Sequence, residues 1–379
     1  MKEGWKIVRL GEVCEVINGY AFDSKLFSTE QGKPLIRIRD IKRGYTETFY
    51  DGDYSSEYIV RKGDFLIGMD GEFNIGEWKS EDALLNQRVC KLVGSKEINI
   101  KYVYYYIPES LKIIENKTSF ATVKHLSSKQ IKAIELPLPP LEEQHRIVSI
   151  LDASFEKIDA LKKNAEENLK NAKALFQQVL AQELKPKEGW VETNMETICT
   201  LCQGLAINAQ TKHLIVEKSN LPLLRIKDLK DGTREIFIDE SNCPENCKVY
   251  PNDIIYTRTG TLGLTFTGMN GVMHNNCFKI NINRDKVDKH YIMHYIQSQS
   301  FKDRVIGMAQ RAAQPDITHK IFKAQYISYP SLEEQHRIVQ TLDTLSKKCR
   351  SLEEVAQHTI RECDALKQSI LRQAFSGEL

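Results

Sequence analysis

The sequence predicts an α+β fold that is written twice along one chain, each copy consisting of a mixed domain followed by a long helix. Two observations support this prediction. The octapeptide LEEQHRIV occupies residues 141–148 and recurs letter for letter at residues 332–339, 191 positions later. Upstream of the octapeptides, PLIRIRDIKRG from Pro34 returns as PLLRIKDLKDG from Pro222. Repetition over such a length indicates one structural unit used twice.

Four segments follow from the repeat. The separation of equivalent residues grows slowly, from 185 for the KEGW segments to 191 for LEEQHRIV, which indicates the same fold with a few insertions in the second copy. Prolines end the mixed parts just before each octapeptide. We therefore expect mixed domains at residues 1–140 and 185–330, and helices at residues 141–184 and 331–379.

The mixed domains combine short strands with helix. The run PLIRIRDI alternates apolar and basic residues, which is the pattern of a half-buried strand whose arginines face outward. The short β-rich runs FLIG and IIYT follow turn signals and predict a further strand in each copy. The runs at 102–107 and 291–296 fit either strand or helix. We favour helix, because Leu111 and Phe301 continue the apolar pattern at helical spacing.

The two long helices are predicted to pair with each other. Apolar and small residues recur alternately three and four apart from Val148 to Val179, and again from Val339, which is a heptad seam. At 1.5 Å per residue each helix is about 60 Å long and needs a long partner. Packing about the two-fold relation of the repeat makes the pair antiparallel, with one domain at each end of a pseudo-two-fold dumbbell. Lys162 and Glu353, equivalent seam residues, are expected to meet there as an ion pair.

Composition excludes some classes of protein and leaves others open. The chain has 53 basic and 51 acidic residues, so its net charge of +2 does not by itself indicate a nucleic-acid partner. No apolar stretch approaches the length of about 18 residues that crosses a bilayer, and Met1 is followed by polar residues instead of a signal peptide. We expect a cytoplasmic protein without membrane contact.

The nine cysteines favour reduced thiols, because their number is odd and their spacing irregular. Cys199, Cys202, Cys243 and Cys247 have spacings that would suit a structural zinc ion. In the first copy, however, only Cys14 matches one of these four residues. We therefore favour ordinary thiols over zinc and expect no metal.

Catalytic signatures are absent from the sequence. It contains no dinucleotide-binding, Walker A or zinc-protease motif, and no N-P-P-[YF] of the kind found in adenine methyltransferases. We therefore expect neither a catalytic site nor a cofactor in this chain.

The order of segments resembles a known family. Two mixed domains alternate with two repeated helices, P-x-P-P-L-E-E-Q-H-R-I-V marks a domain-to-helix junction, and Gly-Trp lies near each domain start. This arrangement closely resembles the specificity subunit of type I restriction-modification enzymes, over the whole chain. The resemblance implies two target recognition domains that each read one half of a split double-stranded DNA sequence. It also implies two modification subunits, which bind S-adenosylmethionine and methylate adenine, and motor nuclease subunits as partners.

Polar loop residues of the domains are the candidate DNA contacts. Arg258 follows a predicted strand and could pair bidentately with guanine O6 and N7. The alternative is that each candidate is an ordinary solvent-exposed side chain without a role in binding. The candidates are Arg37, Arg39, Asn74, Gln87, Arg88, Lys124, Arg225, Lys227, Thr257, Arg258, Asn275, Gln310, Arg311 and Gln314.

The octapeptide itself has two interpretations. Paired glutamates in its first turn complement the helix dipole, but helix capping alone would not enforce identity at the next three positions. These positions either face the modification subunits or anchor each helix start against its own domain. They are Gln144, His145 and Arg146 in the first copy, and Gln335, His336 and Arg337 in the second.

Two other functions compete with DNA recognition. A coiled-coil scaffold or adaptor would share the long helices, although it has little use for two diverged polar domains. Salt-dependent binding of a short duplex separates these two functions. A methyltransferase or nuclease acting alone is the enzymatic rival, and cofactor binding by the isolated chain would identify it.

Overall fold

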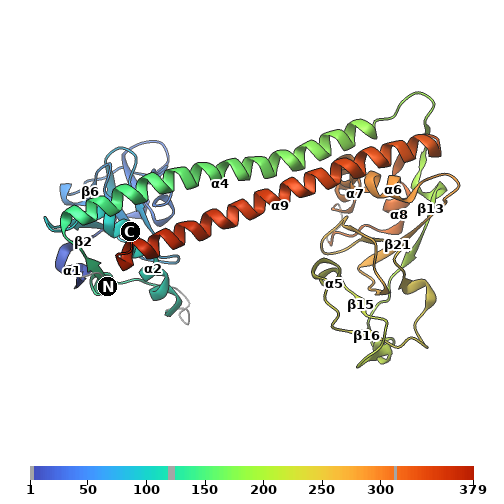
Figure 1. The fold of residues 1–379 in the computed structure, drawn as a ribbon, viewed down its shortest axis with the longest axis horizontal. Coiled ribbons are helices and arrows are strands. Elements are labelled where there is room, and N and C mark those ends of the chain that lie inside the picture. The colour runs from blue at the N-terminus through green and yellow to red at the C-terminus, as the bar shows by residue number, and fades with distance from the viewer. Residues whose placement is uncertain (1–3, 118–123, 311–313) are drawn as a thin grey trace. The chain divides into compact units, whose positions relative to one another are not determined.

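The computed structural model describes residues 4–117, 124–310 and 314–379. The chain forms two compact units. Unit 1 comprises Met1–Asn164 and Thr359–Leu379, and unit 2 comprises Ala165–His358. Each unit contains one mixed domain together with part of helix α4 (Leu141–Glu183) and part of helix α9 (Leu332–Ser376), which lie side by side in each unit (Figure 1).

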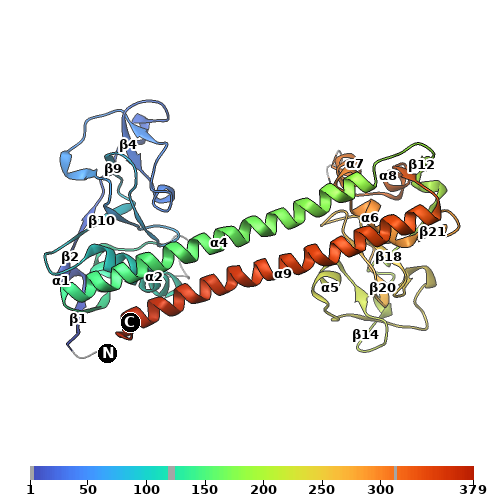
Figure 2. The same cartoon turned by 45° about the horizontal axis from the view of Figure 1, so that its top comes forward.

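The domain of unit 1 is built on two main sheets (Figure 2). An antiparallel sheet has the strand order β2 (Cys14–Asn18), β10 (Val89–Gly94), β7 (Phe65–Gly68), β8 (Ile75–Glu77). A second sheet has the order β3 (Phe27–Ser28), β5 (Phe49–Tyr50), β4 (Lys33–Ile36), β9 (Ala83–Leu85), β6 (Ile59–Val60). Strands β1 (Lys6–Arg9) and β11 (Glu135–Leu138) pair, and the helices are α1 (Leu10–Val13), α2 (Ile100–Lys117) and α3 (Ser128–Lys132).

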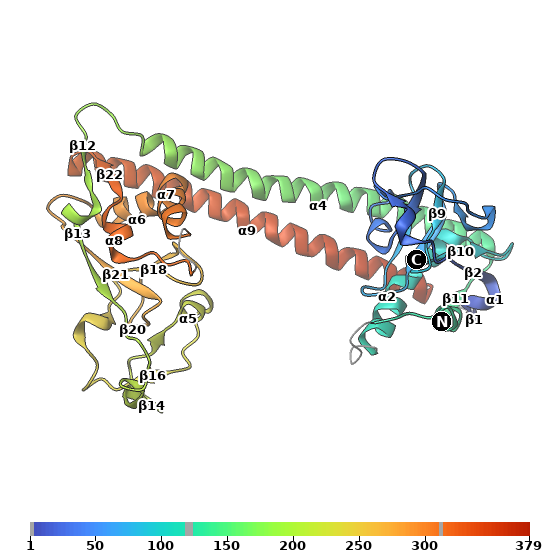
Figure 3. The ribbon, with the colours of Figure 1, turned by 180° about the vertical axis from the view of Figure 1, so that it is seen from behind.

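The domain of unit 2 repeats this plan (Figure 3). Its antiparallel sheet has the order β13 (Cys199–Gln203), β21 (Cys277–Ile282), β18 (Ile254–Thr257), β19 (Thr265–Phe266). A smaller sheet has the order β15 (Leu223–Leu224), β20 (Gly271–Met273), β17 (Lys248–Val249). Strand β14 (Ile215–Val216) pairs with β16 (Phe237–Ile238), and β12 (Val191–Asn194) with β22 (Tyr326–Tyr329). The helices are α5 (Ile226–Asp231), α6 (Lys289–Gln297), α7 (Gln299–Ala309) and α8 (His319–Lys323).

The strands and helices expected from the sequence can be compared with those of the structure. The runs FLIG and IIYT form β7 and β18, and all of their residues are buried, which is why they read as continuous apolar runs. The ambiguous tyrosine-rich runs are helical, in α2 and α6, as their continued apolar spacing predicted. The predicted strand PLIRIRDI is only partly correct, because β4 ends at Ile36 and Ile38–Asp40 forms a 3-10 helix.

The helix pair closes the hydrophobic core of each unit. In unit 1, Ile147 and Leu151 near the start of α4 are fully buried in one cluster with Ala374 near the end of α9. In unit 2 the reverse holds, because Leu180 near the end of α4 lies in one cluster with Ile338 near the start of α9. Each such leucine or isoleucine contributes about 1.5–3 kcal/mol through burial, so domain and helices stabilise each other.

The helices are antiparallel within unit 1, as predicted. Lys162 Nζ lies 2.6 Å from Asp364, and Lys367 Nζ lies 2.5 Å from Asp159, so residue numbers rise along α4 as they fall along α9. The prediction that Lys162 pairs with Glu353 needs correction, because in unit 1 Lys162 forms an ion pair with Asp364. The repeat shows which residues are equivalent, whereas side-chain packing decides the register in which two helices meet.

The described helices include none that is long and apolar enough to cross a membrane.

Candidate nucleic-acid interface

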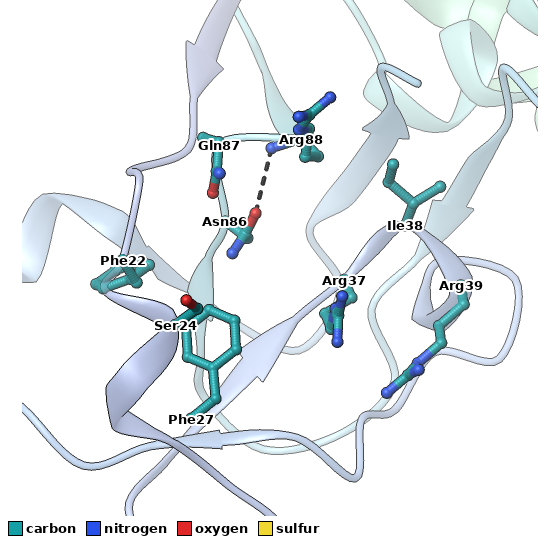
Figure 4. A pocket seen from close by; sticks show the side chains of 9 residues that line it. All are labelled: Phe22, Ser24, Phe27, Arg37, Ile38, Arg39, Asn86, Gln87 and Arg88. Carbon is teal, nitrogen blue, oxygen red and sulfur yellow. Dashed lines mark hydrogen bonds between the residues drawn. The ribbon is translucent and has the colours of Figure 1, made fainter. Parts of the chain in front are cut away.

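Parallel strand pairs position the candidate residues of both units. In unit 1, β4 runs parallel to β9, with Leu35 opposite Leu84 and Ile36 opposite Leu85. Arg37 is the first residue after β4, and the turn 86–88 follows β9 directly. Because parallel strands end at the same edge of a sheet, these residues come together there. They line a pocket of about 410 Å³ (Figure 4), whose lining residues are Phe22, Ser24, Phe27, Arg37, Ile38, Arg39, Asn86, Gln87 and Arg88.

A buried aspartate explains why β4 stops before Arg37. The carboxylate of Asp40, which is 2% exposed, accepts the backbone N–H of Arg37 at 2.8 Å. The Thr46 hydroxyl also lies 2.9 Å from this carboxylate. These contacts cap the 3-10 helix, so Arg37 and Arg39 project from a capped turn instead of the outward face of a strand. The short side chain of aspartate favours such a turn over continued strand pairing.

The opposite wall of the pocket depends on a glycine. A Cβ on Gly19 would lie 2.1 Å from the carbonyl oxygen of Asn86, so only glycine permits this approach of two backbones. The backbone N–H of Gln87 donates to the carbonyl of Tyr20 at 2.9 Å. The backbone of Gln87 is thus fixed, while its side chain is exposed at the pocket.

The basic side chains of unit 1 differ in how far they are neutralised. Arg88 forms an ion pair with Asp70, which also lies 2.6 Å from His125 Nδ1. Arg39 donates to the Thr48 hydroxyl at 3.1 Å. Lys124, away from this pocket, pairs with Glu115 at 2.9 Å. These contacts leave the basic side chains exposed enough to approach a phosphate or base, but they reduce the local positive charge.

Unit 2 contains an equivalent sheet edge, formed by the ends of two parallel strands, but this edge carries different side chains. Strand β15 runs parallel to β20, Arg225 follows β15, and the turn 274–276 follows β20. Gly204 takes the place of Gly19, since a Cβ there would lie 2.3 Å from the carbonyl oxygen of His274. Asn275, another candidate, lies in this turn with a half-buried side chain. The backbone frame is therefore preserved while the exposed chemistry changes.

Arg225, the arginine at the sheet edge of unit 2, forms ion pairs with two acidic side chains. Arg225 binds Asp228 at 2.7 Å and Glu235 at 2.6 Å, and Lys227 binds Glu235 at 2.9 Å. Burial acts to raise the pKa of Asp228, but hydrogen bonds from Arg225 and Thr233 outweigh it and hold this pKa at about 2. Arg225 and Lys227 are thus engaged within their own unit.

Arg258 is also engaged. Its guanidinium binds both carboxylate oxygens of Asp316, with Nε 2.8 Å from Oδ1, and Nη1 donates to the Gln203 side chain at 2.8 Å. The prediction for Thr257 needs correction. This residue is fully buried, its hydroxyl donates to the carbonyl of Thr261, and it accepts from the N–H of Leu264, so it has no surface to offer DNA.

Asn74, Gln310 and Gln314 are not among the residues that line the edge pocket of unit 1. Asn74 donates to the carbonyl of Glu72 at 3.3 Å, and its Oδ1 atom is buried. Gln310 follows the end of α7, and Gln314 is exposed. Arg311 lies outside the described residues.

The glutamine of each octapeptide anchors its helix to its own domain. Gln144 is completely buried, accepts the backbone N–H of Asn99 at 2.8 Å, and donates to the carbonyls of Glu97 and Pro139. Gln335 is also completely buried and makes the same three contacts, with Asp288, Lys286 and Pro330. A partner-facing role for these two residues is therefore wrong, and the anchoring alternative is correct.

The arginine of each octapeptide connects the two helices within a unit. Arg146 binds Glu143 through Nε at 2.6 Å and donates to the backbone carbonyl of the C-terminal Leu379 at 2.6 Å. Arg337 likewise binds Glu334 at 2.7 Å and Glu183, at the end of α4, at 3.3 Å. Both arginines remain about half exposed, at 43% and 51% of the side chain. Both histidines of the octapeptides are also exposed.

The histidines lie beside the caps of the neighbouring helices. His145 Nδ1 is 3.0 Å from the side-chain nitrogen of Asn99, and His336 Nε2 is 3.7 Å from Asp288. Asn99 and Asp288 each precede the domain helix that packs on α4 or α9. Such contacts orient the rings without covering them, since the His336 side chain is 66% exposed.

The four cysteines considered for zinc do not form a ligand set. In the described part of the chain no three His, Cys, Asp or Glu residues are grouped as a metal site. Cys243 and Cys247 belong to an apolar cluster, and burial raises the pKa of Cys199 to about 12. Cys199, Cys243 and Cys247 thus lie in the environment of ordinary buried thiols, while Cys202 is half-buried.

Several residues of the site were not predicted from the sequence. Phe22 and Phe27 line the pocket of unit 1, while Glu235 and Asp316 hold the arginines of unit 2. The only sequence signal for Glu235 was that a glutamate, Glu47, stands at the equivalent position of the first copy. Asp316 lies 58 residues from Arg258 and had no such signal.

Comparisons with known proteins agree on one family. The model described as type I restriction modification DNA specificity domain matches residues 2–171 and 187–361. The EcoBI specificity subunit of Escherichia coli is 31% identical over 421 residues, covering 100% of this chain and 86% of that protein.

Solved structures show the same fold. A chain from a study of the assembly and conformational transition of the type I R-M system has a TM-score of 0.75 at 21% identity, covering 100% of this chain and 99% of that one. The HsdS subunit from Thermoanaerobacter tengcongensis has a TM-score of 0.54 at 21% identity, with coverage of 100% and 98%.

Proposed function

This chain belongs to the family of type I restriction-modification specificity subunits, and from this premise we propose that it selects the DNA sequence on which a larger complex acts. Each domain reads one half of a bipartite duplex target, and the paired helices hold the two halves at a set spacing. The chain supplies recognition, while methyl transfer and cleavage belong to modification and restriction subunits. We place this assembly in the cytoplasm.

The observation that carries the proposal is the repeated edge of parallel strands. Both units build it with the same frame, in which Gly19 or Gly204 permits close backbone approach and Asp40 or Asp228 caps the following turn. The side chains on this frame differ, as with the exposed Gln87 and its half-buried counterpart Asn275. A constant frame with different side chains suits the reading of two different half-sequences, because base edges are distinguished by donor and acceptor patterns.

The helices offer repeated surface for the partner subunits. Leu161 and Leu352 are equivalent residues of α4 and α9, and they are 53% and 56% exposed. Leu175 and Leu366, two heptads further on, are 45% and 50% exposed. Leucines exposed at the same positions of both copies support docking of one kind of partner twice. The exposed histidines of the octapeptides, His145 and His336, form the second candidate contact with these partner subunits.

Selection from randomised duplexes tests the function. The full chain should enrich two constant half-sequences separated by an unspecified gap, and its affinity should fall steeply with salt as phosphate contacts release counterions. A scaffold or adaptor would show neither the enriched sequence nor the salt dependence. Absence of any enriched sequence, both for the chain alone and for the chain with its modification subunits, would overturn the proposal.

A further inference from the structure

The edge pocket of unit 1 contains three guanidinium groups, and among the residues that the structure describes only one of them lacks a protein partner. Arg88 is paired with Asp70, and Arg39 donates to Thr48. Arg37 is exposed, and within residues 4–117, 124–310 and 314–379 its side chain has no hydrogen-bond or ion-pair partner. Figure 4 shows it inside the pocket, between Phe27 and Arg39. Arg37 is therefore the guanidinium that a ligand can engage without breaking an existing contact.

The equivalent arginine of unit 2 is not available in this way. Arg225 is held by Asp228 and Glu235. Unit 1 has Glu47 at the position of Glu235, but Glu47 is exposed and makes no ion pair among the residues that the structure describes. The same arginine and glutamate, ten residues apart, thus pair in one copy and stay apart in the other.

A shift in the connecting loop accounts for this difference. In unit 2 the hydroxyl that binds the capping aspartate comes from Thr233, five residues after Asp228. In unit 1 it comes from Thr46, six residues after Asp40, and this hydroxyl also lies 2.9 Å from the carbonyl of Leu35. The two loops have the same length, but the anchoring threonine directly precedes Glu47 in unit 1 and lies two residues before Glu235 in unit 2, so the two glutamates are placed differently relative to their arginines.

Gln87 is the second open side chain of this pocket. It is exposed on a fixed backbone, and its carboxamide has no hydrogen-bond partner in the described part of the chain. Arg37 and Gln87 follow adjacent parallel strands, which lie about 4.8 Å apart. Both side chains thus start from neighbouring points of one sheet edge, from which they can address neighbouring base pairs.

We propose that Arg37 and Gln87 are the base-reading pair of unit 1, and that Arg225 has no equivalent role in unit 2. Arg37 donates two parallel hydrogen bonds to O6 and N7 of a guanine, and Gln87 binds N6 and N7 of an adjacent adenine. The buried aromatic side of the pocket, with Phe22 only 5% exposed, lowers the local polarity and strengthens these bonds. This inference rests on the proposed function and adds the base class read by one domain.

Duplex selection with matched variants of the full chain tests it. Arg37→Ala should lose guanine preference at one position of one half-site, with discrimination reduced about 10- to 100-fold, while the other half-site stays unchanged. Gln87→Ala should relax the neighbouring position. Arg225→Ala is the matched control from the repeat, and it should leave both half-sequences unchanged. Thermal unfolding of Arg37→Ala should match the parent chain, because no protein contact is removed.

Arg37→Lys separates base reading from simple phosphate contact. A lysine keeps the positive charge but cannot form the bidentate pair. If Arg37 contacts only phosphate, Arg37→Lys and Arg37→Ala will both select the parent sequence, and the inference is overturned. Relaxation of the same position by Arg225→Ala would also overturn it. A parent chain that enriches no sequence contradicts the proposed function itself, whereas an enriched sequence unchanged in Arg37→Ala contradicts this inference alone.

Discussion

The side-chain oxygen of Gln144 accepts the backbone N–H of Asn99 at 2.8 Å, which ties the first turn of α4 to the start of α2. Gln335 forms the same bond with Asp288 in the second copy. Both glutamines are completely buried, and each satisfies two further backbone carbonyls. The octapeptide is therefore a joint between domain and helix, and its conservation between the copies has a structural cause.

We expect Gln144→Ala to lower the free energy of unfolding by about 1–3 kcal/mol, because it leaves buried backbone groups without partners. Gln335→Ala should have an effect of similar size in unit 2. Urea unfolding followed by circular dichroism measures both. Glu166→Ala, at an exposed position of α4, is the control and should change stability by less than about 0.5 kcal/mol. Equal stability of Gln144→Ala and this control would contradict the anchoring role.

Asp228 should make unit 2 sensitive to acid. Its pKa is about 2 in the folded chain and ordinarily 3.8, so the charged form is favoured by folding. The stabilisation is present above about pH 4 and is lost as the pH falls towards 2, and we expect it to be about 2 kcal/mol. Asp228→Asn should be less stable than the parent at pH 7, and the difference should shrink at low pH. Urea titrations between pH 7 and pH 2 test this, and a constant difference would contradict it.

Helix length should set the gap between half-sites. Seven residues inserted at matching positions of α4 and α9 preserve the heptad seam and add about 10.5 Å. At about 3.4 Å per base pair, the selected gap should grow by up to about three base pairs, while both half-sequences stay the same. Insertion of four residues is the control, because it breaks the seam. An assembled seven-residue variant with the original gap would show that the helices do not determine spacing.

A circular permutant should fold and assemble. Trp5 and Leu379 pack in the same hydrophobic cluster of unit 1, so the two ends of the chain belong to one core. Joining them and opening the chain near Lys185, after α4 ends at Glu183, imitates a connection that the repeat already contains. Size-exclusion chromatography with the modification subunits measures assembly. Failure of the soluble permutant to assemble, beside a parent chain that does, would contradict the prediction.

The sequence by itself determined the repeat, the antiparallel helix pair and the α+β character of the domains. These features are local or periodic. An identical octapeptide, a heptad seam and buried apolar runs such as β7 can each be read from neighbouring residues, because burial imposes regular spacing on the chain. The tyrosine-rich run in α2 was identified as helix for the same reason.

Only the tertiary structure decided which polar side chains are open. Arg37 and Arg225 are equivalent in sequence, yet a different threonine binds the capping aspartate in each loop, and Arg37 is exposed while Arg225 is paired with Glu235. Arg258 was one of several candidate DNA contacts in the sequence, and only the structure shows that Asp316, 58 residues away, binds it. The sequence left open whether Gln144 faces a partner or anchors its helix, and its complete burial against three backbone groups decides for the anchor. Hydrogen bonds and ion pairs depend on distances of about 3 Å between groups far apart in the chain, and no local pattern records them.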